Sequence, residues 1–201
     1  MTLTATPAPT TMSDTTIRRL ALGMSSGALI WSAFSFVYGF QPTTDLAWML
    51  TDLSSLIFQA GLLCLLAIMI RTQATGTSRT ARIMLQVERV LLVPAMTWSL
   101  LHAVLPDQRD AAWLAILDVF WPLSMLGMFV IGVKVAFAGR WRGLARFWPM
   151  VAESWAVVSI PSMGILGPEV GNLVAASHLL IGYTTLGLII AFKPELVRTE
   201  S

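Results

Sequence analysis

The sequence is poor in the residues that most secreted scaffolds and soluble enzymes depend on. It has one cysteine, Cys64, and therefore cannot form a disulfide framework. Its two histidines, His102 and His178, allow at most one site with two imidazole ligands. Charged residues make up 12 % of the chain, about half the usual share of a soluble domain. No phosphate loop, zinc-protease signature or serine-nucleophile motif occurs, so no motif specifies a reaction.

Long apolar segments make up most of the chain instead. Hydrophobic residues account for 56 % of it, and the mean hydropathy is +0.73. A helix needs roughly 20 apolar residues to cross a hydrocarbon core of about 30 Å. We therefore predict an all-α fold, a polytopic integral membrane bundle of six transmembrane helices, with no room for a soluble domain. The expected spans are 19–40, 46–70, 83–105, 111–138, 147–166 and 170–192.

The positive charges predict the orientation of this bundle, because Lys and Arg near the ends of spans gather on the cytoplasmic side. Of the loops that would face outward, only the one with Arg109 carries such a residue. The cytoplasmic set would be Arg18, Arg19, Arg71, Arg79, Arg82, Arg140, Arg142, Arg146, Lys193 and Arg198. Both termini are then cytoplasmic, and the protein is a multi-pass component of the cytoplasmic (plasma) membrane.

The same reading divides the chain into a disordered cytoplasmic tail over 1–18, a six-helix domain over 19–192 and a second tail over 193–201. The partner of the helical domain is the lipid bilayer. We expect no nucleic-acid binding, since the basic residues that give a pI near 9.1 flank the spans and form no separate patch.

Ionisable side chains inside the spans are the candidates for function, because they are costly in hydrocarbon and usually face the bundle interior. Asp52, Ser55 and Gln59 share one helical face, which should point inward. Counting about 1.5 Å of rise per residue separates the remaining groups by depth. The expected outer layer is Asp52, His102, Asp118 and His178, and the expected inner layer is Glu88, Arg89, Lys134 and Glu153.

Structural roles compete with functional ones in both layers. In the inner layer, ion pairs of Glu88 or Glu153 with Lys134 or Arg89 would only orient the helices. In the outer layer, two carboxyls meet only two imidazoles. Asp118 would therefore pair with Asp52 or a histidine, or stay protonated.

Other features inside the spans also have two readings. Trp31, Trp121 and Trp155 lie too deep for an interfacial belt, and we expect lipid-facing bulk rather than the walls of a pocket. Gly23 and Gly27 form a G-x-x-x-G step that permits close helix contact, within the chain or in a homo-oligomer. Proline residues near the middle or the end of three spans can kink them, although we favour prolines that are tolerated because neighbouring helices satisfy the freed groups; they are Pro94, Pro122 and Pro161.

The leading functional hypothesis is a small secondary transporter or channel whose intramembrane carboxylates couple to protons. Asp52, Asp118 and His178 would line an outward-facing site, and Glu88 and Glu153 would continue a proton pathway inward. This hypothesis requires no cofactor.

Three alternatives stay open. His102 and His178 could ligate a haem or, with the two aspartates, a metal ion. Asp118, with Trp121, Met125 and Trp155 as walls, could be the general acid of an intramembrane enzyme acting on a lipid or isoprenoid. A non-catalytic subunit of a membrane complex would use every buried charge only to hold helices together.

Overall fold

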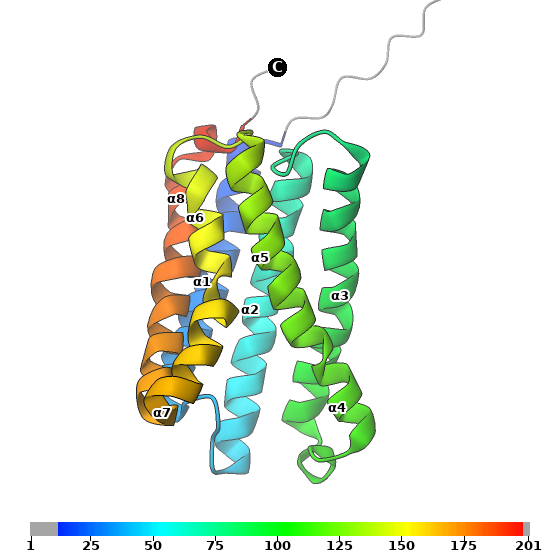
Figure 1. Cartoon of the computed structure of the whole chain (residues 1–201), viewed down its shortest axis with the longest axis vertical. Coiled ribbons are helices and arrows are strands. Elements are labelled where there is room, and N and C mark those ends of the chain that lie inside the picture. The colour runs from blue at the N-terminus through cyan, green and yellow to red at the C-terminus, as the bar shows by residue number, and fades with distance from the viewer. Residues whose placement is uncertain (1–11, 199–201) are drawn as a thin grey trace, which may run out of the picture.

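The computed structural model of the protein describes residues 12–198, and the regular elements within that range are all helical. The long helices are α1 (Asp14–Tyr38), α2 (Asp45–Arg71), α3 (Arg79–Val104), α5 (Phe120–Ala138) and α7 (Trp155–Leu179). The shorter ones are η1 (Pro106–Gln108), α4 (Ala112–Asp118), α6 (Gly143–Glu153), η2 (Leu180–Thr184), α8 (Thr185–Phe192) and η3 (Pro194–Leu196). Figure 1 shows them as an upright bundle, in which α1 begins and α8 ends at the same end.

Five helical stretches are long and apolar enough to cross a membrane, as expected of a multi-pass membrane protein. They are Asp14–Tyr38, Asp45–Arg71, Arg79–Val104, Ala112–Ala138 and Gly143–Phe192. The first helix begins inside the segment 1–18 that was predicted to be a tail, and residues 1–11 and 199–201 lie outside the described residues.

The last stretch, of 50 residues, is a helical hairpin. Its continuity breaks at Gly167, which has φ 82° and ψ 168° and is followed by Pro168. The two arms are antiparallel, since the indole N–H of Trp155 donates to the carbonyl of Ala175 (2.9 Å) and that of Trp148 to the carbonyl of Gly182 (2.8 Å). The arms correspond to the predicted spans 147–166 and 170–192, and Figure 1 shows the ribbon turning back near the label α7.

The first three helices begin with the hydroxyl caps that their sequences supply. The side chains of Ser13, Thr44 and Ser78 each accept a hydrogen bond from the backbone N–H three residues later. This contact satisfies one of the donors that the first helical turn leaves unpaired.

The helix breaks differ in part from the proline positions. The helix breaks at Val119, just before Pro122. A proline ring clashes with the carbonyl four residues earlier, which here is that of Asp118, and this clash accounts for the break. In contrast, α3 and α7 run through Pro94 and Pro161. Two further irregularities, a turn at Ser154 and the π-helix η2, had no proline to predict them.

Helix α1 lies at the centre of the packing. A Cβ added to Gly27 would lie 2.8 Å from the carbonyl oxygen of Ile57 in α2, and one added to Gly187 would lie 2.6 Å from that of Ala21. Gly23 faces the Sγ of Cys64. The Gly23 and Gly27 step therefore contacts α2 of the same chain, and an oligomer formed through these residues stays a prediction.

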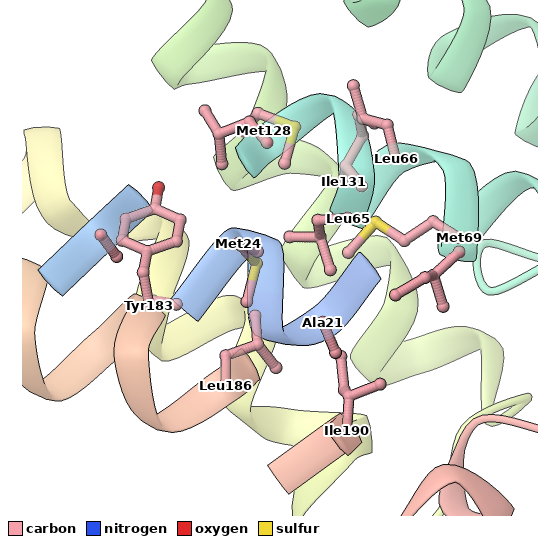
Figure 2. Close-up of a cluster of buried hydrophobic side chains, with 14 of the residues drawn as sticks. Ala21, Met24, Leu65, Leu66, Met69, Met128, Ile131, Tyr183, Leu186 and Ile190 are labelled. Atoms are coloured by element: carbon pink, nitrogen blue, oxygen red, sulfur yellow. The ribbon is translucent and has the colours of Figure 1, made fainter. Parts of the chain in front are cut away.

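Around this contact lies an apolar core built from the halves of the helices nearer the α1 start and the α8 end (Figure 2). It joins side chains of α1, α2, α5, η2 and α8, among them Met24, Leu65, Met128, Tyr183 and Leu186, each fully buried. Large apolar side chains such as Val90 and Phe137 are exposed on the outside of the bundle, as lipid-facing residues are.

Candidate functional site

A cavity of about 710 Å³ lies at the end of the bundle opposite the α1 start and the α8 end, within the size range of small-molecule sites. Its walls are mainly aromatic, formed by Trp31, Trp48, Trp98, Trp121, Trp155 and Phe40. Its polar lining consists of Gln41, Thr51, Asp52, Ser55, Asp118 and Asn172. These residues come from α1, α2, α3, α4, α5, the hairpin and the loop after α1.

The deep tryptophans are the centre of this wall. The ring of Trp31 lies 5.7 Å from that of Trp121 and 5.6 Å from that of Trp155, and Trp121 and Trp155 are 5.3 Å apart in an edge-on contact. Trp31 and Trp155 are each 3 % exposed. The expectation that these residues are lipid-facing bulk is wrong, because they pack on one another around the cavity.

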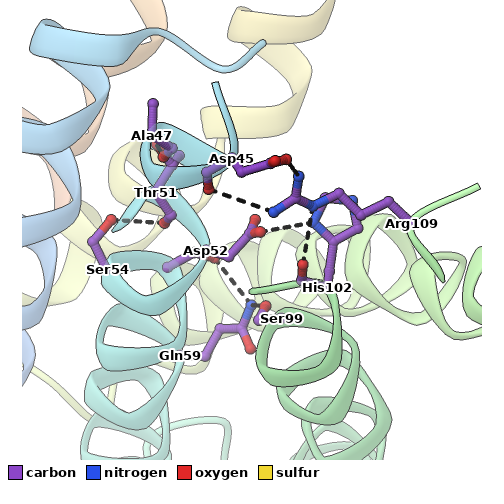
Figure 3. Close-up of polar contacts among 10 residues, drawn as sticks. Asp45, Ala47, Thr51, Asp52, Ser54, Gln59, Ser99, His102 and Arg109 are labelled. Atoms are coloured by element: carbon purple, nitrogen blue, oxygen red, sulfur yellow. Dashed lines mark hydrogen bonds and ion pairs between the residues drawn. The ribbon is translucent and has the colours of Figure 1, made fainter. Parts of the chain in front are cut away.

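Asp52, which lines the cavity, forms a buried pair with His102, which lies behind the lining residues. The Nδ1 of His102 lies 2.7 Å from a carboxylate oxygen of Asp52, and the two residues are 8 % and 4 % exposed. The imidazole stacks on Trp98 at 4.8 Å and meets the edge of Trp48 at 5.2 Å. The pair joins α2 to α3, as Figure 3 shows.

The polar stripe that begins at Asp52 continues into the bundle. Gln59 donates from its amide to the hydroxyls of Ser55 (3.2 Å) and Ser99 (2.8 Å). Asp52, Ser55 and Gln59 are all buried. The shared inward face that their spacing predicts is confirmed.

Arg109, the basic residue of the predicted outer loops, lies at the mouth of the cavity. Its guanidinium donates to Asp45 at 2.5 Å, and its Nε donates to the carbonyl of His102 at 3.2 Å. The guanidinium carbon lies 6.0 Å from the ring of Trp48. The charge of Arg109 is therefore paired with Asp45, and its position orders the rim around His102 (Figure 3).

Asp118 differs from Asp52 in having no such partner. It is the last residue of α4, it is exposed, and it makes no hydrogen bond or ion pair with the described part of the chain. It does lie close enough to His102 and Asp52 to interact electrostatically with both. The structure thus brings Asp52 and Asp118 into one cavity, and His102 is joined to it through its hydrogen bond with Asp52.

His178 does not share this site. Its Nε2 lies 3.1 Å from the hydroxyl of Ser154, and the ring is not part of the cavity lining. Among residues 12–198, no group of three His, Cys, Asp or Glu is placed to hold a metal ion. The grouping of His178 with Asp52 and Asp118 therefore has no geometric support.

The inner carboxyls are buried with hydroxyl partners instead of cations. Glu88 is 1 % exposed and accepts a hydrogen bond from Ser124, and Glu153 is fully buried and accepts one from Tyr183 at 2.5 Å. One oxygen of Glu153 has no partner within the described range.

The cations expected to pair with these carboxyls lie elsewhere. Arg89 and Lys134 are exposed, and Arg89 donates to Gln86. The expected inner ion pairs are thus absent from the described residues. Tyr183, which replaces them at Glu153, was missed at the sequence level, although it is one of only two tyrosines in the chain.

Comparisons of this chain with known protein families, with curated proteins and with solved structures found no match. The function is therefore argued from the geometry of the cavity and of the buried carboxyls.

Proposed function

We propose that the protein is a small secondary transporter of the cytoplasmic membrane whose solute binds in the tryptophan-lined cavity. In this proposal the hairpin Gly143–Phe192 crosses the membrane twice, giving six crossings with both termini cytoplasmic. The cavity then opens toward the outside.

One observation carries the proposal: a cavity that holds an unpaired carboxylate lies at one end of the bundle, and two more buried carboxyls lie nearer the other end. Phe58 and Tyr183 are fully buried and lie edge to face at 4.8 Å, so the aromatic packing closes the path inward from Trp31. A site open on one side and shut on the other is what alternating access requires of one of its states.

The helix irregularities supply elements that such a change of state needs. The break at Val119 follows Asp118, the turn at Ser154 lies beside Glu153, and the π-helix η2 contains Tyr183. Breaks and π-bulges inside helices are places where the backbone can rearrange at moderate cost. In this proposal each of the three irregularities lies next to a side chain that binds or exchanges a proton, namely Asp118, Glu153 or Tyr183.

Proteoliposomes that enclose a pH-sensitive dye test this proposal. We expect wild-type protein to move protons when a transported solute is added outside, and Asp118→Asn and Glu153→Gln to lose at least nine-tenths of that signal. Asp110→Asn, in the exposed loop before α4, is the matched control and should retain it. Solute uptake without any proton movement, or a wild-type proton signal in Glu153→Gln, would show that the carboxyls do not couple transport to protons.

A second function is favoured by the Asp52 and His102 pair, because a carboxylate that orients an imidazole at 2.7 Å is also the arrangement of a general base. An intramembrane enzyme acting on a lipid or isoprenoid would use this pair within the aromatic cavity. Mass spectrometry of lipids incubated with the purified protein decides between the two, since an enzyme yields a product that His102→Gln abolishes.

A further inference from the structure

The charges around the cavity favour a positively charged ligand. Asp52 and Asp118 both line it, and no Lys or Arg of the described residues does. The charge of Asp52 is shared with His102, whereas that of Asp118 has no cation in contact. The nearest guanidinium, that of Arg109, is already paired with Asp45. Asp118 is therefore the carboxylate that is free to meet a cation.

The aromatic walls narrow the class of cation. Five tryptophans surround the space, and Trp is the side chain whose ring face attracts a cation most strongly. Walls of this kind suit an ammonium group that carries its own apolar substituents, because such a group loses little hydration when it leaves water. A small, strongly hydrated metal ion would instead need a shell of oxygen ligands, and tryptophan rings supply none.

The neutral polar groups of the lining point to a second feature of the ligand. The side-chain amides of Gln41 and Asn172 both line the cavity, and neither is hydrogen-bonded to another described residue. Asn172 belongs to α7, on the hairpin side of the cavity, while Asp118 ends α4 on another side. An unpaired amide can donate to an acceptor such as a carbonyl or ether oxygen.

From this arrangement we propose that the cavity binds a monovalent organic ammonium compound that also carries a hydrogen-bond acceptor. The ammonium group lies among the tryptophans with Asp118 as its counter-ion, and the acceptor meets Asn172 or Gln41. This inference rests on the proposed function for the route across the membrane, but binding itself does not depend on transport.

Calorimetric titration of the purified full chain in a neutral detergent tests the ligand class with three probes of similar shape. Acetylcholine has the charge and the acceptor, 3,3-dimethylbutyl acetate has the acceptor without the charge, and pentyltrimethylammonium has the charge without the acceptor. We expect acetylcholine to bind at least tenfold more tightly than either of the others. Equal affinity for the neutral ester, or no binding of acetylcholine at millimolar concentration, would overturn the assignment.

Single substitutions test which residue causes the preference for the positive charge and which causes the preference for the hydrogen-bond acceptor. Asp118→Asn should weaken acetylcholine binding at least tenfold and leave the neutral ester unchanged, and Asn172→Ala should reduce only the preference for acetylcholine over pentyltrimethylammonium. Asp110→Asn is the control for a lost surface charge. An Asp118→Asn variant that elutes as wild type and still binds acetylcholine normally would contradict the role of Asp118 as counter-ion.

The two proposals fail in different ways. Radiolabelled acetylcholine that binds to the protein but does not enter proteoliposomes would refute transport and leave the ligand class standing. Proton-coupled uptake of an anionic or neutral solute, with no binding of acetylcholine, would refute the ligand class and leave transport standing.

Discussion

Single side chains link the helices at the cavity end of this bundle. Asp52 and His102 are buried at 2.7 Å from each other, and each satisfies a group that would otherwise be unpaired in an apolar wall. A buried ion pair often adds little net stability relative to an apolar pair. Removal of one partner is nevertheless strongly destabilising, because the other group is then buried without a partner. The two residues should therefore be energetically coupled.

A double-mutant cycle measures that coupling. We expect Asp52→Asn and His102→Gln each to destabilise the protein, and the double variant to be less destabilised than the sum, with a coupling energy of about 1–3 kcal/mol. Unfolding followed by circular dichroism in mixed detergent gives the four free energies. Strict additivity would mean that the contact contributes nothing to stability. The Gln59→Leu variant, about two turns deeper than Asp52, reports whether Ser99 matters separately.

Much of the residue-level site was predictable, and the errors have a physical cause. Helical rise places Asp52, His102 and Asp118 at similar depth, and in the structure Asp52 and Asp118 line one cavity while His102 contacts Asp52. Depth alone says nothing about which side of the bundle a residue faces. His178 was grouped with them for its depth, but it faces Ser154 away from the cavity lining. Contacts between helices decide such cases, and one sequence does not contain them.

At the scale of elements, the hairpin depends on the backbone of Gly167. Its φ of 82° with ψ of 168° lies in a region that essentially only glycine enters. The next residue, Pro168, cannot donate a backbone hydrogen bond, so the two residues together end one arm and begin the other. Gly164, three residues earlier, is an ordinary helical position, and an added Cβ meets nothing within 4 Å at either glycine.

This pair of glycines gives a matched test of the turn. Gly167→Ala should destabilise the protein by about 1–3 kcal/mol because of backbone strain. Gly164→Ala should be neutral or stabilising by up to about 1 kcal/mol, since alanine is the better helix former. Thermal unfolding in detergent, followed by tryptophan fluorescence, compares the two. Equal melting temperatures would show that the turn does not require a left-handed residue.

The elements also show where sequence patterns stop being informative. Apolar length predicted the long helices, and the hydroxyl residues Ser13, Thr44 and Ser78 mark three of their starts. Proline was a weaker guide, because Pro94 and Pro161 are accommodated inside helices while Ser154 and η2 interrupt them without any proline. At one of these irregularities, the π-helix η2, the indole of Trp148 from the neighbouring α6 donates to the backbone carbonyl of Gly182.

At the scale of the whole molecule, polar groups are separated along the bundle axis. The open cavity with Asp52 and Asp118 lies at one end, and the buried carboxyls of Glu88 and Glu153 lie nearer the other. A scaffold protein that used buried charges only to fix its helices would pair them with cations. Glu88 and Glu153 are instead held by hydroxyls, and Arg89 and Lys134 remain exposed. These hydrogen bonds also join helical elements, α3 to α5 and α6 to η2, and the proton-exchange role of the two carboxyls is the part of the proposal that Glu153→Gln tests.

Membrane topology decides whether the cavity faces outward, and the chain is well suited to a direct measurement. Its single cysteine can be removed by Cys64→Ser, after which one cysteine at a time is introduced at an exposed position. Asp110→Cys and Glu169→Cys lie at the cavity end, and Thr77→Cys and Lys193→Cys lie at the opposite end. A membrane-impermeant maleimide then reports which end is outside.

With six crossings and cytoplasmic termini, Asp110→Cys and Glu169→Cys should react in intact cells, and Thr77→Cys and Lys193→Cys only after permeabilisation. The decisive position is Lys193, because the hairpin Gly143–Phe192 precedes it. If that stretch crossed the membrane only once, Lys193→Cys would react from the same side as Asp110→Cys. If Asp110→Cys and Glu169→Cys both reacted only after permeabilisation, the bundle would have the opposite orientation in the membrane. The tryptophan cavity would then receive its ligand from the cytoplasm.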